Sequence, residues 1–194
     1  MSLQLDPLKT ALVMIDLQNG IAAMPVGPHP AADVVARAVT MAEACAGAGG
    51  LVVPVNVGFS GGAADRLMQP VDMPAQIPAG GPPPGWSDLV PPVAALPASF
   101  RITKRQWSAF HGTELDLQLR RRGMTTIVLC GISTNFGVES TAREGWQHNY
   151  AIVIAEDACT SGQAELHRFA IEKILPRIAR VRSTAEIVAA LRGH

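Results

Sequence analysis

Short runs of aliphatic and β-branched residues alternate along this chain with longer segments of helical periodicity. Such alternation is typical of a parallel sheet whose two faces are covered by helices. Because the apolar runs are nearly free of polar residues, both faces of the strands are expected to be buried. The pattern therefore predicts an α/β fold. Its expected strands are 10–15, 51–55, 101–103, 125–130, 151–155 and 177–181, and its expected helices are 31–48, 113–122, 135–147, 163–174 and 184–191.

The segment 56–99 interrupts this rhythm. It contains nine of the chain's 15 prolines and shows no sustained period. Long irregular segments in compact domains are usually functional or disordered, so we expect this excursion to fold over the site or to build a subunit contact. A chain of 194 residues can form one sizeable core. We therefore predict a single domain over 1–194 with an excursion at about 56–99.

The charge composition limits the classes of partner. Sixteen acidic side chains balance sixteen basic ones, and no block rich in Lys and Arg is present. Nucleic acids and anionic membrane surfaces attract basic patches, so neither is an expected partner. A small-molecule substrate and a second copy of the chain are the expected ones.

The apolar runs near the N-terminus are much shorter than the roughly 20 residues that cross a bilayer. The first residues also lack the basic region and apolar core of a signal peptide. The three cysteines, Cys45, Cys130 and Cys159, are widely spaced and odd in number, which favours reduced thiols over a disulfide framework or a zinc site. We therefore predict a cytoplasmic protein.

Polar groups follow several predicted strands at the edge where α/β sheets bind ligands. Asp16 follows the strand 10–15, and Lys104 follows the strand 101–103. A half-desolvated carboxyl beside an ammonium group is able to act as an acid or a base near neutral pH. The glycine-bearing turn 131–137 is expected to present backbone N–H groups to an anion.

Four segments at these positions resemble the isochorismatase-like hydrolase superfamily, which includes nicotinamidases and N-carbamoyl amidohydrolases. They are 11–18 (ALVMIDLQ), 104–113 (KRQWSAFHGT), 131–135 (GISTN) and 139–143 (ESTAR). The resemblance covers nearly the whole chain outside the excursion. It implies a Rossmann-like three-layer α/β/α sandwich with a six-stranded, mainly parallel sheet, and assembly into dimers or tetramers.

The resemblance also implies roles for three positions. The family's usual catalytic set is a cysteine nucleophile, an aspartate and a lysine. Asp16 and Lys104 match the last two, whereas Gly137 stands where the cysteine is expected. True isochorismatases are similar in having glycine there, and they hydrolyse a vinyl ether without a covalent enzyme intermediate. By this likeness Asp16 would protonate the terminal methylene carbon of the substrate.

Further positions follow from the same likeness. The expected substrate-binding residues are Gln18, Trp107, Phe110, Ser133 and Phe136, with Arg66 and Arg105 as additional candidates for binding an anion. A non-proline cis peptide is expected at Ile132–Ser133. The segment after the second strand, 56–60, lacks the histidine and aspartate that bind the nicotinamidase metal, and no histidines form a pair at helical spacing. We therefore expect neither a metal nor another cofactor.

Three functions remain open from the sequence. The leading one is a hydrolase that acts on a small carboxylate-bearing metabolite, with Asp16 as acid or base and Lys104 as its electrostatic partner. The second is a non-catalytic relative that binds a small anion. The third is an amidohydrolase of the same superfamily that uses water or Cys130 in place of the usual thiol.

Overall fold

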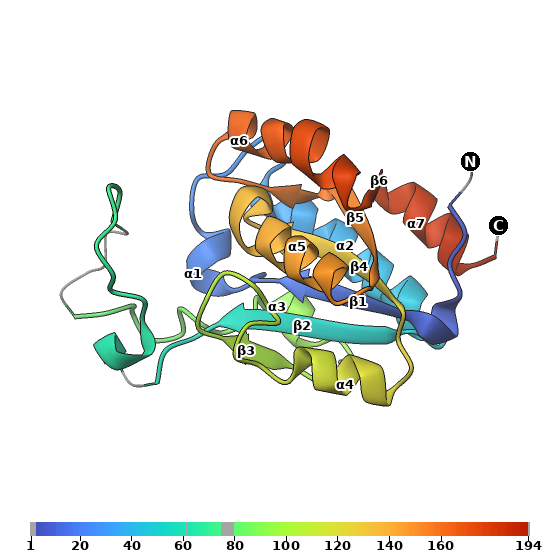
Figure 1. The fold of residues 1–194 in the computed structure, drawn as a ribbon, viewed down its shortest axis with the longest axis horizontal. Coiled ribbons are helices and arrows are strands. Elements are labelled where there is room, and N and C mark those ends of the chain that lie inside the picture. The colour runs from blue at the N-terminus through green and yellow to red at the C-terminus, as the bar shows by residue number, and fades with distance from the viewer. Residues whose placement is uncertain (1–2, 61, 75–79, 194) are drawn as a thin grey trace.

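The fold is a six-stranded parallel sheet between two layers of helices (Figure 1). A computed structural model describes residues 3–60, 62–74 and 80–193. Every strand pair in the sheet is parallel, in the order β3-β2-β1-β4-β5-β6, so the predicted α/β class is confirmed. The strands are β1 (Thr10–Ile15), β2 (Leu51–Val57), β3 (Ile102–Lys104), β4 (Thr126–Ile132), β5 (Ala151–Thr160) and β6 (Arg180–Arg182).

Helices cover both faces of this sheet. Figure 1 shows α5 in front of the strands and α2 behind them. A capping box is present at the start of α7, where the side chains of Ser183 and Glu186 each accept from the other residue's backbone N–H. The helices are α1 (Asn19–Ala22), α2 (Ala31–Gly47), α3 (Pro91–Ala94), α4 (Leu115–Arg121), α5 (Glu139–Gln147), α6 (Ala164–Phe169) and α7 (Thr184–Leu191).

The central strands form the core. All six residues of β1 are buried, and in β4 every residue after the first is buried. Full burial of one aliphatic side chain stabilises a fold by about 1.5–3 kcal/mol relative to exposure. The buried centre of the sheet therefore holds in position the polar residues that follow its strands.

The chain reverses its winding between β1 and β4, and the two strands come unusually close at their carboxyl ends. Gly131 pairs with Ile15 and has a φ of 126°. A Cβ atom on Gly131 would lie 2.0 Å from the carbonyl oxygen of Ile15. Glycine is thus required here, and the close approach aligns the segments that follow β1 and β4, where a ligand site is expected in such sheets.

Two of the predicted helices contain π-helical turns in the structure. The segment expected as one helix over 135–147 begins with a π-helical turn, Thr134–Val138, before α5. Similarly, α6 continues into a π-helical stretch, Ala170–Ile174. In the first turn the N–H of Val138 donates to the carbonyl of Ser133, which widens the turn and brings Gly137 against β1. Periodicity alone does not distinguish this wider turn from an α-helix.

The excursion is anchored at its base. Asn56 donates to the carbonyl of Ser87, and the N–H of Gly20 donates to the carbonyl of Trp86. Figure 1 shows its outer part projecting beyond the carboxyl edge of the sheet. It includes two short helical elements that the sequence did not predict, Gly62–Asp65 and α3. Residues 61 and 75–79 of the expected excursion lie outside the described residues.

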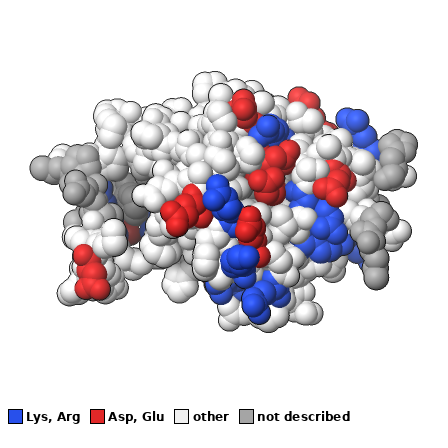
Figure 2. Space-filling model, turned by 90° about the horizontal axis from the view of Figure 1, so that it is seen from above, with Lys and Arg blue, Asp and Glu red and all other residues white. Residues whose placement is uncertain are grey.

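Two surface properties bear on partners. Acidic and basic side chains are interspersed on the face shown in Figure 2, as the balanced composition suggests. Among the described helices, none combines the length and apolar character that a membrane crossing requires.

Candidate active site

The carboxyl ends of β1 and β3 bring Asp16 and Lys104 into direct contact. The distance from Lys104 Nζ to Asp16 Oδ2 is 2.7 Å, and both side chains are almost fully buried. Lys104 also donates to the carbonyl of Gln106. Because an ammonium group has three N–H donors, these two bonds leave a third for a ligand. The two residues that the sequence predicted as a pair thus form one buried ion pair.

Asp16 is held in an unusual state. Burial raises its pKa from 3.8 to about 6, although Lys104 acts in the opposite direction. Its Oδ1 atom is buried and has no hydrogen-bond partner among the described residues. Its backbone has a φ of 52°, a conformation that side chains other than Gly, Asn and Asp seldom adopt. Strain and an unsatisfied polar atom in one residue are typical of functional sites.

Gly137 lies directly beside this carboxyl. A Cβ at this position would be 3.2 Å from Asp16 Oδ2 and 2.9 Å from Ile15 Cγ2. The position predicted by likeness to hold the nucleophile therefore adjoins the acid, but it has no side chain. Cys130 does not replace it, because its thiol is completely buried in β4 and burial raises its pKa to about 12.

The other predicted binding residues fall into two groups. Trp107 and Phe136 are largely exposed, and their rings contact each other with centroids 4.8 Å apart. They flank Gly137, since Phe136 precedes it and the carbonyl of Trp107 would be 3.6 Å from its Cβ. Phe110 instead is buried and stacks on Tyr150. Ser133 follows the non-proline cis peptide at Ile132–Ser133, which is present as predicted.

Gln18 is fully buried, and its amide binds backbone on both sides of the excursion. Its Nε2 donates to the carbonyls of Val57 and Trp86, and its Oε1 accepts from the N–H of Val57. These bonds hold the residues after Asp16 against the end of β2. The side chain is therefore engaged in positioning the chain at the site's border.

Comparison with known proteins identifies the family of the chain. Residues 10–186 match the isochorismatase domain. The chain belongs to the isochorismatase family. It is similar to the uncharacterized isochorismatase family protein YecD of Escherichia coli O157:H7, with 52% identity over 189 residues, covering 97% of this chain and all of that protein. An isochorismatase family protein from Burkholderia thailandensis has a similar structure, with a TM-score of 0.91 and 41% identity, covering 97% of this chain and 98% of that one.

A third relative is an amidohydrolase. The ureidoacrylate amidohydrolase RutB of Methylobacterium radiotolerans is 31% identical over 225 residues, covering 96% of this chain and 81% of that protein. The matched residues include β1, β4 and the segments that follow them. This isochorismatase-family hydrolase thus has the Rossmann-like architecture that the sequence predicted.

The segment after β2 does not fit a nicotinamidase-type metal in this isochorismatase-family chain. The side-chain amide of Asn56 donates to the carbonyl of Ser87 and accepts from the Thr103 hydroxyl. Gly58 has no side chain to contribute a ligand. Asn56 and Ser60 are the polar side chains of this segment, and both are already engaged within the protein, so no catalytic step is derived through a metal there.

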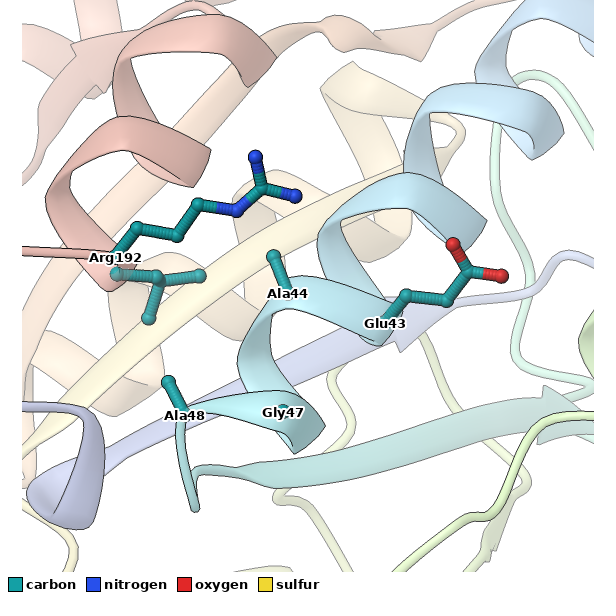
Figure 3. Close-up of a pocket in the computed structure, with 6 residues that line it drawn as sticks. Glu43, Ala44, Gly47, Ala48 and Arg192 are labelled. Atoms are coloured by element: carbon teal, nitrogen blue, oxygen red, sulfur yellow. The ribbon is translucent and has the colours of Figure 1, made fainter.

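A surface hollow of about 460 Å³ lies far from this pair (Figure 3). It is lined by Glu43, Ala44, Gly47 and Ala48 of the α2 end and by Leu191 and Arg192 of the α7 end. The end of α2 leads into the first residues of β2, so the hollow lies at the amino edge of the sheet, whereas Asp16 lies at the carboxyl edge. It contains no nucleophile, and we assign it no part in the chemistry.

A second cluster of titratable side chains was missed by the sequence reasoning. His29, Glu156 and His167 converge so that their ligand atoms all lie within 4.8 Å of one another. His29 and Glu156 are separated by 127 residues, so no local spacing could have signalled them. Knowing the sheet order would have helped, because it places the β5 end beside the π-helical turn.

Proposed function

We propose that this isochorismatase-family hydrolase cleaves a small carboxylate-bearing metabolite without a covalent enzyme intermediate, using Asp16 as the acid and base and Lys104 as its electrostatic partner. The observation that carries this proposal is the buried ion pair at 2.7 Å beside a glycine. The site thus provides a proton-transfer group beside the position where the family's thiol chemistry would need a sulfur atom.

The protonation state of Asp16 suits such a role. With a pKa of about 6, roughly a tenth of the carboxyl is protonated at pH 7, far more than at its ordinary value of 3.8. The free Oδ1 atom is the atom able to carry this proton, because Oδ2 accepts from Lys104. When a substrate carboxylate binds Lys104, it weakens the ion pair and raises the pKa of Asp16 further.

For a vinyl-ether substrate the steps balance as follows. Asp16 gives its proton to the terminal methylene carbon, and an oxocarbenium ion forms at the ether carbon. Water adds to that carbon and returns a proton to Asp16. The resulting hemiketal then breaks its carbon–oxygen bond to release pyruvate and an alcohol. Trp107 and Phe136 supply an apolar border to the site. Arg105 follows Lys104 in the chain, but its guanidinium is paired with Asp65 at 3.2 Å.

The test is a substrate panel of isochorismate, nicotinamide and N-carbamoyl acids, assayed with the wild type and with Asp16→Asn. We expect turnover of the vinyl ether and a loss of about 10²- to 10⁴-fold in kcat for Asp16→Asn, because the variant cannot transfer the proton. Asp33→Asn is the matched control, since Asp33 is exposed in the first turn of α2. An Asp16→Asn variant with undiminished turnover refutes the assignment.

The pH dependence of kcat separates the acid from the base. If proton donation starts the reaction, kcat decreases as the pH rises through the pKa of Asp16 in the substrate complex, which lies above the value of about 6 in the free protein. A kcat that increases through the same midpoint means that Asp16 must be ionised, which contradicts the vinyl-ether mechanism.

An amidohydrolase is the second candidate, and the likeness to ureidoacrylate amidohydrolase supports it. With glycine at position 137 and Cys130 buried, this reaction would need water activated by ionised Asp16. Turnover restricted to amides in the same panel would favour it. A non-catalytic anion-binding protein is the remaining alternative. It would hydrolyse no compound of the panel, and Asp16→Asn would change only its affinity.

A further inference from the structure

The second cluster joins three segments on the other side of the π-helical turn. Glu156 comes from the second half of β5, His167 from α6, and His29 from the loop before α2. Glu156 Oε1 lies 3.1 Å from His29 Nε2 and 3.3 Å from His167 Nε2. The two imidazole rings are nearly perpendicular, with centroids 5.6 Å apart. Both Nε2 atoms therefore face one carboxylate oxygen.

These distances match those between ligand atoms around a metal ion. With bonds of about 2.0–2.1 Å, neighbouring ligands are roughly 2.8–3.0 Å apart around an octahedral ion and roughly 3.3–3.4 Å apart around a tetrahedral one, a range of roughly 2.8–3.4 Å. The two nitrogen-to-oxygen distances fall within this range. Two histidines and one carboxylate are also a ligand set that suits zinc and other first-row transition ions. Two of the three pairs of ligand atoms are therefore already at separations that suit a bound ion.

Thr134 orients one of the ligands from behind. Its hydroxyl is 2.8 Å from His167 Nδ1, and both residues are buried. A hydroxyl either accepts from an Nδ1–H or donates to a bare Nδ1. When it accepts, the lone pair of His167 lies on Nε2 and faces the cluster. Metal-binding histidines typically have such a partner on the second nitrogen.

Exposure provides a route for the ion. His167 is only 3% exposed, whereas His29 and Glu156 are 24% and 36% exposed. The cluster is thus closed on its protein side and open to solvent on the other. The open side leaves room for water to complete the coordination shell. The Glu156 carboxylate on this open side attracts a cation.

We propose that His29, Glu156 and His167 form a binding site for one divalent first-row transition ion of the Zn²⁺ class. The ion would replace the bonds between Glu156 and the two histidines and would connect the loop before α2, β5 and α6. Since Thr134 belongs to the same π-helical turn as Gly137, the bound ion would also stabilise the wall of the active site from outside. The site is separate from Asp16 and Lys104.

The test uses untagged protein that has been treated with a chelator and then dialysed. Zn²⁺ binding is measured by calorimetry, and Co²⁺ binding by its visible absorption spectrum. We expect one ion per chain. Zn²⁺ at about 100 times its Kd should raise the Tm by about 5–10 °C. His29→Asn and Glu156→Gln should each weaken binding by at least about tenfold.

Matched controls come from a second histidine–glutamate pair. His148, directly after α5, lies 3.9 Å from Glu144 of α5, and no third ligand joins them in the described part of the chain. His148→Asn and Glu144→Gln should therefore leave binding unchanged. Circular dichroism verifies that each variant is folded. His29 lies in a loop and is partly exposed, so His29→Asn keeps the test decisive if Glu156→Gln does not fold. Wild-type binding no tighter than that of His29→Asn, or equal loss in the control variants, overturns the proposal.

Discussion

The Asp16–Lys104 pair and the His29–Glu156–His167 cluster lie against the same π-helical turn, but they differ in exposure. Lys104 and Asp16 have side chains that are 3% and 6% exposed, whereas Glu156 is 36% exposed. In the buried pair, desolvation changes the chemistry of the carboxyl itself. In the half-open cluster, solvent screens the charges and leaves access for a ligand. Similar ionic side chains therefore suit proton transfer in the buried pair and reversible ion binding in the half-open cluster.

The largest effect is expected from Lys104→Met, which leaves the Asp16 carboxylate buried without its cation. The variant should lose about 3–5 kcal/mol of stability at pH 8, measured by urea unfolding. The folded state binds the Asp16 proton more tightly than the unfolded state, so stability declines as the pH rises from about 4 towards about 6. Without Lys104 the pKa rises further, and the decline extends to higher pH.

The matched control for Lys104→Met is Lys173→Met, because Lys173 is 65% exposed and its contact with Glu172 is 3.9 Å long. This control should change stability by less than about 1 kcal/mol. Equal losses in the two variants would mean that burial does not distinguish the active-site pair from a surface pair.

A smaller effect is expected from Gly137→Ala. Its Cβ would approach Ile15 Cγ2 to 2.9 Å, and that methyl is fixed to a fully buried strand. We expect a loss of about 1–3 kcal/mol in the free energy of unfolding, as for other overpacked cores. Gly162→Ala, with open space around the new methyl, should change it by less than about 1 kcal/mol. An equally stable Gly137→Ala would show that the site has room for a side chain.

Smaller still is the expected effect of Glu156→Gln in chelator-treated protein. The amide oxygen can still accept from a histidine N–H, and the contacts are partly solvated. The free energy of unfolding should fall by about 0.2–1 kcal/mol. A loss as large as that of Lys104→Met would erase the contrast between the two clusters.

No effect is expected from thiol alkylation of the native protein. Cys45, Cys130 and Cys159 are all buried, and burial raises the pKa of each thiol. Only the thiolate reacts readily, so iodoacetamide should leave both turnover and mass unchanged. Denatured protein is the control and should gain three adducts, one for each cysteine. Inactivation coupled to a single adduct on Cys130 would support the thiol version of the amidohydrolase.

Local patterns were enough for most of the fold. The strand 10–15 has the predicted bounds, and the order of elements followed from apolar runs and glycine-ended helices. The end of β5 was set five residues too early, at 155 rather than at Thr160. Polar Glu156 and Asp157 interrupt its apolar run, and the pairing of β5 with β4 shifts register there. Such an irregularity depends on the neighbouring strand and is invisible in one segment.

The candidate site was predictable in part for a similar reason. Asp16 follows β1 and Lys104 is the last residue of β3, and the carboxyl ends of parallel strands meet at one edge of the sheet. The sequence around Phe110 does not indicate that this residue is buried, yet its ring stacks in the core on Tyr150. The direction of a side chain in a loop is set by tertiary packing, as is the convergence of His29 with Glu156. Neither is encoded in local spacing.

The Gln18 amide has a consequence for how this protein can change. By donating to the carbonyls of both Val57 and Trp86, it holds two parts of the excursion against the residues that follow Asp16. The outer part of the excursion makes a separate contact, in which Asp65 pairs with Arg105, the neighbour of Lys104, at 3.2 Å. Any change in the loop that breaks the Gln18 bonds would therefore displace the residues beside the acid.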